Sequence, residues 1–306
     1  MKALGTLGLF LALSAHATTY YVTISGLGGE PDYDQRFKMW AQQIDSSLKK
    51  AGGDSNVITL EAPTRDQVRA RMNNVAKEAK STDAFVLMLI GHGTYDGTEY
   101  KFNLPGPDLT GAEIGAMLDR IPAARQLVVN MTSASGGSMD VLRKPGRIII
   151  AATKSGSEKN ATIFARYWAD ALSDPAADVD KNESVSALEA YRFASRKTGE
   201  FFETEKRLAT EHAVLEDTGK GEGDRNPGAD NNEGKLAAAF PVVRLGANAE
   251  AARNPVKRPL IEQKEQIEQA IDRLKYDKAA LPADVYKKQL TQLLLQLAKV
   301  QEEIDK

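Results

Sequence analysis

The sequence contains no cysteine in its 306 residues. That absence excludes disulfide bonds, thiolate metal ligands, a lipid-modified N-terminal cysteine and a cysteine nucleophile. Histidine is also scarce, because only His92 and His212 lie beyond the first seventeen residues. Two histidines without cysteine do not supply an ordinary zinc site. A chain of this length without disulfides must depend on its hydrophobic core for stability.

The chain also lacks a strong net charge and, beyond residue 17, a long apolar run. Its formal charge is −2, which gives no indication of a nucleic-acid partner or of an acidic membrane surface. No later segment approaches the roughly 18 apolar residues of a membrane-spanning helix. With 42% hydrophobic and 27% charged residues, the composition is that of a globular protein. We expect no membrane span in the mature form.

Residues 1–17 have the features of a secretory signal peptide. Lys2 is a short positive region, and residues 4–13 form an apolar region of about ten residues, too short to span a bilayer. The tripeptide Ala-His-Ala at 15–17 supplies small residues for cleavage before Thr18. We therefore expect an exported bacterial protein, either periplasmic or secreted.

Short apolar segments alternate with helical patterns along the first two thirds of the chain. The segment 84–90 is apolar on both faces, which is typical of a strand inside a parallel sheet. The alternation predicts an α/β fold, a three-layer sandwich around a mainly parallel sheet. The expected strands are residues 20–25, 56–60, 84–90, 126–131 and 147–153. The expected helices are residues 36–51, 64–80, 135–142 and 161–172, and a further helix opens at a Thr110–Glu113 capping box.

The composition divides the mature chain into a main domain and an appendage. The main domain is expected over residues 18–252, with an acidic loop at 178–189 and a flexible loop rich in Gly, Asp and Asn at 218–234. Residues 253–306 contain a proline-bearing linker and apolar residues in coiled-coil-like spacing, interrupted at Pro282. This pattern predicts an antiparallel helical hairpin. The hairpin is either a cap on the main domain or an arm that binds a partner or self-associates.

Polar residues follow the third and fourth expected strands. Gly91-His92-Gly93 comes after the third, and the segment 132–137 comes after the fourth. The carboxyl ends of parallel strands emerge at the same edge of a sheet, where ligands usually bind. A base at His92 and a nucleophile at Ser133 can meet there, with loop amides as oxyanion donors.

These strand ends resemble those of the caspase-like peptidases, and the legumain branch in particular. In that family one hydrophobic strand ends in His-Gly, as LMLIGHG does at 87–93, and another ends in Ala-Cys-x-Ser-Gly, where this chain has TSASG at 132–136. The resemblance extends over residues 20–191 and implies a caspase-like sandwich. It also implies that His92 is the general base, that Gly93 is a backbone oxyanion donor, and that Ser133 replaces the nucleophilic cysteine.

The same resemblance implies a set of residues near the substrate: Met131, Ser135, Lys154 and Glu158. Met131 replaces a residue that is usually polar, and the basic residue that legumains have after the first strand finds no match in 32–34. We therefore expect little cleavage after asparagine.

The serine at position 133 leaves the activity open. A cysteine beside a histidine is readily ionised, whereas a serine needs a base that is itself oriented by a third group, and the sequence identifies no such group. We favour a catalytically silent or weak homologue that binds a peptide or protein. One alternative is a peptide or amide hydrolase with a serine nucleophile, and another is an envelope interaction protein that acts through the hairpin. No organic cofactor is expected.

Residues 178–189 resemble an EF-hand calcium loop, in which oxygen ligands recur at fixed positions. The expected ligands are Asp178, Asp180, Asn182, Ser184, Ser186 and Glu189. Position 6 of the loop is Glu183 instead of the usual glycine. The segment therefore predicts weak calcium binding, the alternative being a solvated acidic loop that caps the following helix.

Overall fold

The computed structural model describes residues 17–221 and 223–306 of the chain, so nearly all of the expected signal peptide lies outside the described residues. A six-stranded sheet forms the centre, in the order β10-β8-β7-β3-β1-β2. Five strands are parallel, and only β10, at one edge, is antiparallel to its neighbour. The strands are β1 Thr19–Ser25, β2 Ser55–Glu61, β3 Ala84–Gly91, β7 Arg125–Thr132, β8 Arg147–Ala151 and β10 Val214–Glu216. The five strands expected from the sequence are confirmed.

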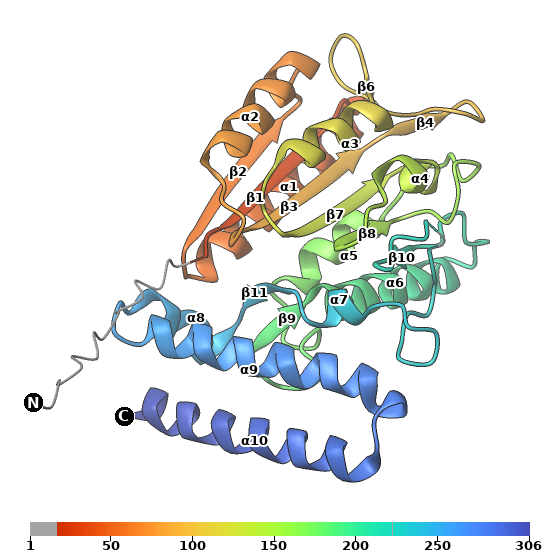
Figure 1. Ribbon diagram of the computed structural model, residues 1–306. Coiled ribbons are helices and arrows are strands. Elements are labelled where there is room, and N and C mark those ends of the chain that lie inside the picture. The colour runs from red at the N-terminus through yellow and green to blue at the C-terminus, as the bar shows by residue number, and fades with distance from the viewer. Residues whose placement is uncertain (1–16, 222) are drawn as a thin grey trace, which may run out of the picture.

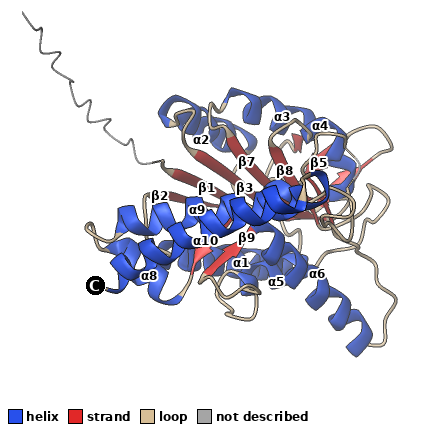
Figure 2. Ribbon diagram, turned by 60° about the horizontal axis from the view of Figure 1, so that its bottom comes forward, coloured by secondary structure: helices blue, strands red, loops and turns tan. Residues whose placement is uncertain are grey.

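Helices cover both faces of this sheet, as Figures 1 and 2 show. Successive side chains of a strand point to opposite faces. Accordingly, Phe85 belongs to the hydrophobic cluster of one face, and Val86 to that of the other. The first face is covered by α2 (Arg65–Glu78) and α3 (Gly111–Arg120). The second is covered by α1 (Pro31–Lys50), α5 (Phe164–Ala171) and α6 (Ala187–Thr204). The predicted three-layer sandwich with a mainly parallel sheet is confirmed.

The helix boundaries follow local chemistry. The capping boxes of Thr64 with Gln67 and of Thr110 with Glu113 are both formed, so two backbone N–H groups at each helix start are satisfied. The helix α1 begins at Pro31, earlier than the expected residue 36. Proline is pre-organised for the first helical position, and acidic residues in the first turn favour the positive end of the helix dipole.

Short elements complete the main domain. A small antiparallel sheet follows β3, a 3₁₀ turn and a short helix follow β7, and a two-stranded ribbon joins the acidic loop to a later segment. These elements are β4 Gly93–Tyr95, β5 Tyr100–Phe102, β6 Leu109–Thr110, η1 Ser135–Ser138, α4 Met139–Leu142, β9 Ser184–Ser186, α7 Lys235–Ala238, β11 Pro241–Arg244 and α8 Gly246–Arg253.

The chain ends in the predicted helical hairpin, formed by α9 (Arg258–Tyr276), η2 (Asp277–Ala280) and α10 (Ala283–Asp305). Figure 1 shows the hairpin beyond the end of the sheet at which the parallel strands begin. The helix α9 is fastened to the main domain by Arg244, whose guanidinium donates to both carboxylate oxygens of Glu265, at 2.5 and 2.8 Å. Among the described residues, no helix combines the length and the apolar character needed to cross a bilayer.

The ion pair between Arg244 and Glu265 is expected to contribute to stability, because Glu265 is 8% exposed and Arg244 20% exposed. Glu265→Gln removes the carboxylate charge that the Arg244 guanidinium contacts, so we expect a loss of about 2 kcal/mol in the free energy of unfolding. Chemical denaturation measures this loss. Glu302→Gln, at an exposed carboxylate of α10, is the matched control and should change stability by less than about 0.5 kcal/mol. Equal effects of the two substitutions would contradict a stabilising role of the pair.

Candidate functional site

The two sequence motifs meet at the carboxyl edge of the sheet. The parallel register pairs Gly91 of β3 with Thr132 of β7, so the next residues, His92 and Ser133, leave neighbouring strands side by side. The Nδ1 atom of His92 lies 3.5 Å from the Oγ atom of Ser133. The distance expected for a base and a nucleophile is therefore observed, at the long end of hydrogen-bond reach.

The imidazole of His92 is held by aromatic rings from α1. Tyr33 and Phe37 contact it in edge-to-face geometry, with centroid distances of 4.8 and 5.2 Å. Burial lowers the pKa of His92, while a hydrogen bond to the backbone of Gly28 and two nearby carboxylates act in the opposite direction. The lowered pKa favours the neutral imidazole, which is the state a general base requires.

The backbone of Gly28 supplies the orienting group that the sequence did not identify. Its peptide N–H donates to Oδ1 of Asp34 at 2.7 Å, so a side chain of α1 holds the loop that bonds the imidazole. A Cβ atom at position 28 would lie 2.3 Å from the backbone nitrogen of Asp34, so only glycine fits there. A backbone group has no side-chain signature, which explains why the motifs did not reveal it.

The turn after β7 presents Ser133 at a constrained position. Ala134 has a left-handed backbone, with φ of 55°, and its N–H donates to the carbonyl oxygen of Glu158 at 2.8 Å. Gly93 packs so closely that a Cβ atom there would lie 2.5 Å from the carbonyl oxygen of Ser133. Ser133 itself is only 2% exposed. The chain thus places Gly93 next to Ser133 but leaves Ser133 almost inaccessible. The role of Gly93 as an oxyanion donor stays a prediction.

The residues predicted to contact a substrate are buried or paired with other side chains. They do not offer free side chains around His92 and Ser133, which are called the dyad below. Met131 and Ser135 are buried at 1% and 0% exposure, which does not favour the role predicted for them. Lys154 is exposed and lies 3.9 Å from Glu158 in an ion pair. The Glu158 carboxylate also contacts Nδ1 of His212 at 2.5 Å, so these three side chains stabilise the loop around residues 154–158.

A basic pocket lies beside the dyad, and the sequence motifs did not indicate it. It has a volume of about 630 Å³ and lies between α1, the segment before α5, and the end of α6. Its charged residues are Arg36, Arg166 and Arg207, and none of the three forms an ion pair with a carboxylate in the described parts of the chain. Tyr33 joins the pocket to the dyad, because its ring contacts both His92 and the guanidinium of Arg36. The full lining is Tyr33, Arg36, Met39, Trp40, Asn160, Ala161, Thr162, Ile163, Arg166, Phe201, Phe202, Arg207 and Thr210.

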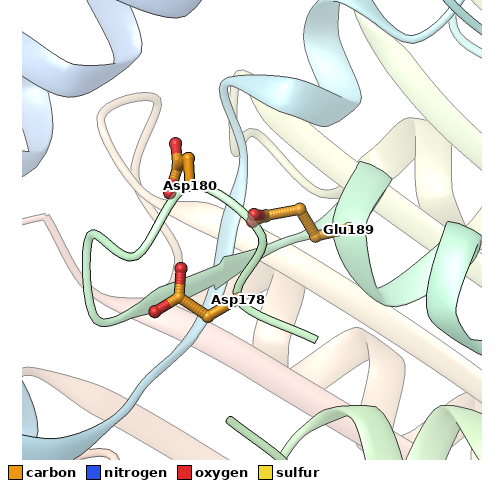
Figure 3. A group of neighbouring side chains, drawn as sticks. All are labelled: Asp178, Asp180 and Glu189. Atoms are coloured by element: carbon orange, nitrogen blue, oxygen red, sulfur yellow. The ribbon is translucent and has the colours of Figure 1, made fainter. Parts of the chain in front are cut away.

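The acidic loop brings together three of its six expected ligands. Ligand oxygens of Asp178, Asp180 and Glu189 lie within 4.8 Å of one another, on the loop and on the first turn of α6 (Figure 3). Glu183 at position 6 adopts a φ of 64°, so the turn forms without the usual glycine.

The other three expected ligands have different partners. The Asn182 amide oxygen accepts from the backbone of Ser184, and the Ser184 hydroxyl donates to Val243. Ser186 caps α6 together with Glu189, in a third capping box. The loop therefore both caps a helix and gathers three carboxylates.

Further carboxylates reach this loop from α9. A cavity of about 310 Å³ is lined by Asp180 and Glu189 on one side and by Glu268 and Asp272 on the other. Burial raises the pKa of Asp180 to about 6, with repulsion from Glu189 as the next cause. Burial likewise raises the pKa of Glu268 to about 8. The contribution of α9 to this acidic site could not be read from the loop motif.

Comparison with known proteins gives distant likenesses only. No protein-family model and no curated protein matches the sequence. Among solved structures, the initiator caspase Dronc of Drosophila is 12% identical, with 68% of this chain and 81% of that chain covered and a TM-score of 0.47. Caspase-1 of Spodoptera frugiperda is 11% identical, with 66% and 88% covered and a TM-score of 0.47. A protein from Geobacter sulfurreducens is 13% identical, with 59% and 89% covered and a TM-score of 0.41. These values are too low to carry over a residue role, and the likeness to legumains rests on the sequence motifs alone.

The pairing of His92 with Ser133 can be tested without knowledge of a substrate. Ser133→Cys places an ionisable thiol beside an existing imidazole, which favours the thiolate. We expect it to react with iodoacetamide at pH 6 to 7 faster than a free thiol in the unfolded chain. The wild type should not react at any thiol, because it has none. The rate advantage should disappear in Ser133→Cys/His92→Ala, and a rate unaffected by that second substitution would show that the two side chains do not act as a pair.

Proposed function

We propose that this chain binds peptide segments bearing a carboxylate side chain, which enters the basic pocket while the neighbouring peptide backbone lies beside Ser133 and His92. The observation that carries the proposal is the group of three guanidinium ions around one cavity, none of which has a carboxylate partner among the described residues. Guanidinium groups bind carboxylates through two parallel hydrogen bonds. Three of them concentrated at one cavity favour an anionic ligand over a neutral one.

Several features of the pocket favour a peptide over a small inorganic anion. Its volume of about 630 Å³ is within the range of sites for organic ligands, and Trp40 and Phe202 contribute apolar walls. Thr162 lines the pocket and donates to the carbonyl oxygen of Met131 at 2.7 Å, so the pocket wall is tied to the strand that carries Ser133. A side chain in the pocket therefore brings its own backbone toward the carboxyl edge of the sheet.

Binding is favoured over hydrolysis by the surroundings of the hydroxyl. A serine nucleophile must reach the carbonyl carbon of its substrate, yet Ser133 is 2% exposed. The amide of the following residue, Ala134, already donates to Glu158, so it does not serve as an oxyanion donor. A binding role requires neither access to the hydroxyl nor an oxyanion site.

Peptide or amide hydrolysis is the second candidate, supported by the 3.5 Å separation between His92 and Ser133. In this reaction the Ser133 oxygen attacks the carbonyl carbon as its proton passes to Nδ1 of His92. The imidazolium then protonates the leaving nitrogen, and water releases the acyl group from the serine. The hydrogen bond to Gly28 and the rings of Tyr33 and Phe37 hold the imidazole during these transfers. Opening of the cover over Ser133 has to precede the attack.

The binding proposal predicts a preference for acidic peptides. Fluorescein-labelled peptides that differ only in Asp, Asn, Glu or Gln at one position are compared by fluorescence anisotropy. The acidic members should bind about tenfold or more tightly than their amides, because each charge-assisted hydrogen bond contributes roughly 1.5–3 kcal/mol. Arg36→Gln and Arg166→Gln should remove this preference, whereas Arg120→Gln, at the exposed end of α3, is the control and should retain it. Equal binding of acids and amides would contradict the proposal.

Hydrolysis is distinguished by a fluorophosphonate probe. Covalent labelling at Ser133 that is lost in Ser133→Ala and in His92→Ala would favour the second candidate. Under the binding proposal, Ser133→Ala should still bind acidic peptides more tightly than their amides in the anisotropy measurement, because the pocket does not include that hydroxyl.

We also propose that the acidic loop binds calcium weakly, with a Kd on the order of 10⁻⁴ M or poorer. The support is the convergence of three carboxylates, together with the raised pKa of Asp180, which is due first to burial and then to repulsion from Glu189. A divalent cation between these oxygens removes that repulsion. Asp178, Asp180 and Glu189 would hold it, with backbone oxygens or water as further ligands.

Calcium at millimolar concentration is expected to raise the Tm, because it binds only the native state. The pKa of Asp180 is raised to about 6 in the folded chain, against about 4 when unfolded. Without calcium, the stability due to this group is present at acid pH and is lost as the pH rises through about 6. The increase in Tm caused by calcium should therefore be larger at pH 7.5 than at pH 5. Asp180→Asn should reduce it without removing the Glu189 cap, and a Tm unchanged by calcium in the wild type would contradict the proposal.

A further inference from the structure

The carboxylate of Asp83 is buried, and no cation of the described residues pairs with it. Asp83 immediately precedes β3 and is 3% exposed. Its Oδ1 accepts the backbone N–H of Thr18 at 3.0 Å, and its Oδ2 accepts that of Lys80 at 2.7 Å. Within the described ranges, no lysine, arginine or histidine side chain forms an ion pair with it. A buried carboxylate normally has a cation nearby, because removing its charge from water costs several kcal/mol.

Other negative charges also lie in the region of this carboxylate. Burial raises the pKa of the neighbouring Tyr20 hydroxyl, and the charges of Asp83, Glu78 and Asp54 raise it further. These charges act on the Tyr20 hydroxyl, two residues after Thr18. Asp83 accepts the N–H of Thr18 itself, so a positive charge on that nitrogen would be stabilised by the Asp83 carboxylate.

The nitrogen of Thr18 is the atom at which such a charge can arise. Thr18 is fixed on both sides, because its N–H contacts Asp83 and its carbonyl oxygen accepts the N–H of Ala84 at 3.0 Å. The same nitrogen follows the Ala-His-Ala cleavage pattern at residues 15–17. Two independent observations, one of sequence and one of structure, thus point to a single bond, Ala17–Thr18.

We propose that cleavage of the Ala17–Thr18 bond creates an α-ammonium group that forms a partly buried ion pair with Asp83. Hydrolysis consumes one water, breaks the C–N bond, leaves a carboxylate on Ala17 and leaves an amine on Thr18. That amine takes up a proton, because α-amino groups titrate near pH 8. The hydrogen bond of the precursor becomes a charge-assisted one, and the new terminus becomes part of the packed sheet. This inference rests on the expected export of the chain and is independent of the basic pocket.

The test uses the full chain, exported with its own leader from a bacterial host. A second chain carries one alanine inserted between Ala17 and Thr18, so its processed form has an amide at Thr18 and an ammonium about 3.8 Å farther out. Intact mass should show that the first protein begins at Thr18 and the second at the inserted alanine. The insertion should lower the Tm on the order of 5 °C. The same insertion should have no effect in an Asp83→Asn background and its full effect in an Asp54→Asn background, since Asp54 is exposed and does not contact Thr18.

A labelling experiment makes the test independent of whether Asp83→Asn folds. An amine-reactive reagent at pH 7 should modify the α-amino group of the native protein about tenfold more slowly than that of the insertion protein, because only the former is ion-paired. A mature mass that begins elsewhere, an equal Tm for the two proteins, or equal labelling rates would each overturn the proposal. An insertion effect of the same size in the Asp83→Asn background would overturn it as well.

Discussion

The parallel pairing of β3 with β7 is the constraint on which the rest of the site depends. Both strands are buried on both faces, so a shift of register by one residue would move a whole set of apolar side chains to the wrong layer. The register that burial selects pairs Gly91 with Thr132. His92 and Ser133 are therefore neighbours as a consequence of hydrophobic packing, before any interaction between their own side chains is considered.

The layers could be predicted because they arise from patterns that extend over many residues. The segment 84–90 is apolar at every position, and the capping boxes at Thr64 and Thr110 mark helix starts locally. The short strands β9 and β11 could not be predicted in this way, since three or four residues do not establish a period. Their pairing is decided by contacts between segments more than fifty residues apart.

The candidate site was predictable only where its residues follow a strand. His92 and Ser133 stand in recognisable motifs at two strand ends, whereas Gly28 acts through its backbone. The arginines of the basic pocket come from α1, α5 and the segment after α6, so no spacing along the chain reveals them. Likewise Glu268 joins the acidic loop only because α9 packs there. A feature formed by one segment can be predicted from the sequence. A feature formed by residues of several segments can be recognised only once the fold is known.

The place of β1 in the sheet has a consequence for the order of assembly. Although it is the first strand of the described residues, β1 lies between β2 and β3, with a parallel partner on each side. Both partners come later in the sequence and are therefore synthesised after β1. Because they are parallel to β1, each is reached through a crossover connection. The first strand therefore stays half-paired until the chain has been made as far as Gly91. The sheet therefore forms around a strand that is synthesised before both of its partners. A chain interrupted before Gly91 leaves one edge of β1 unpaired, and such an edge favours aggregation.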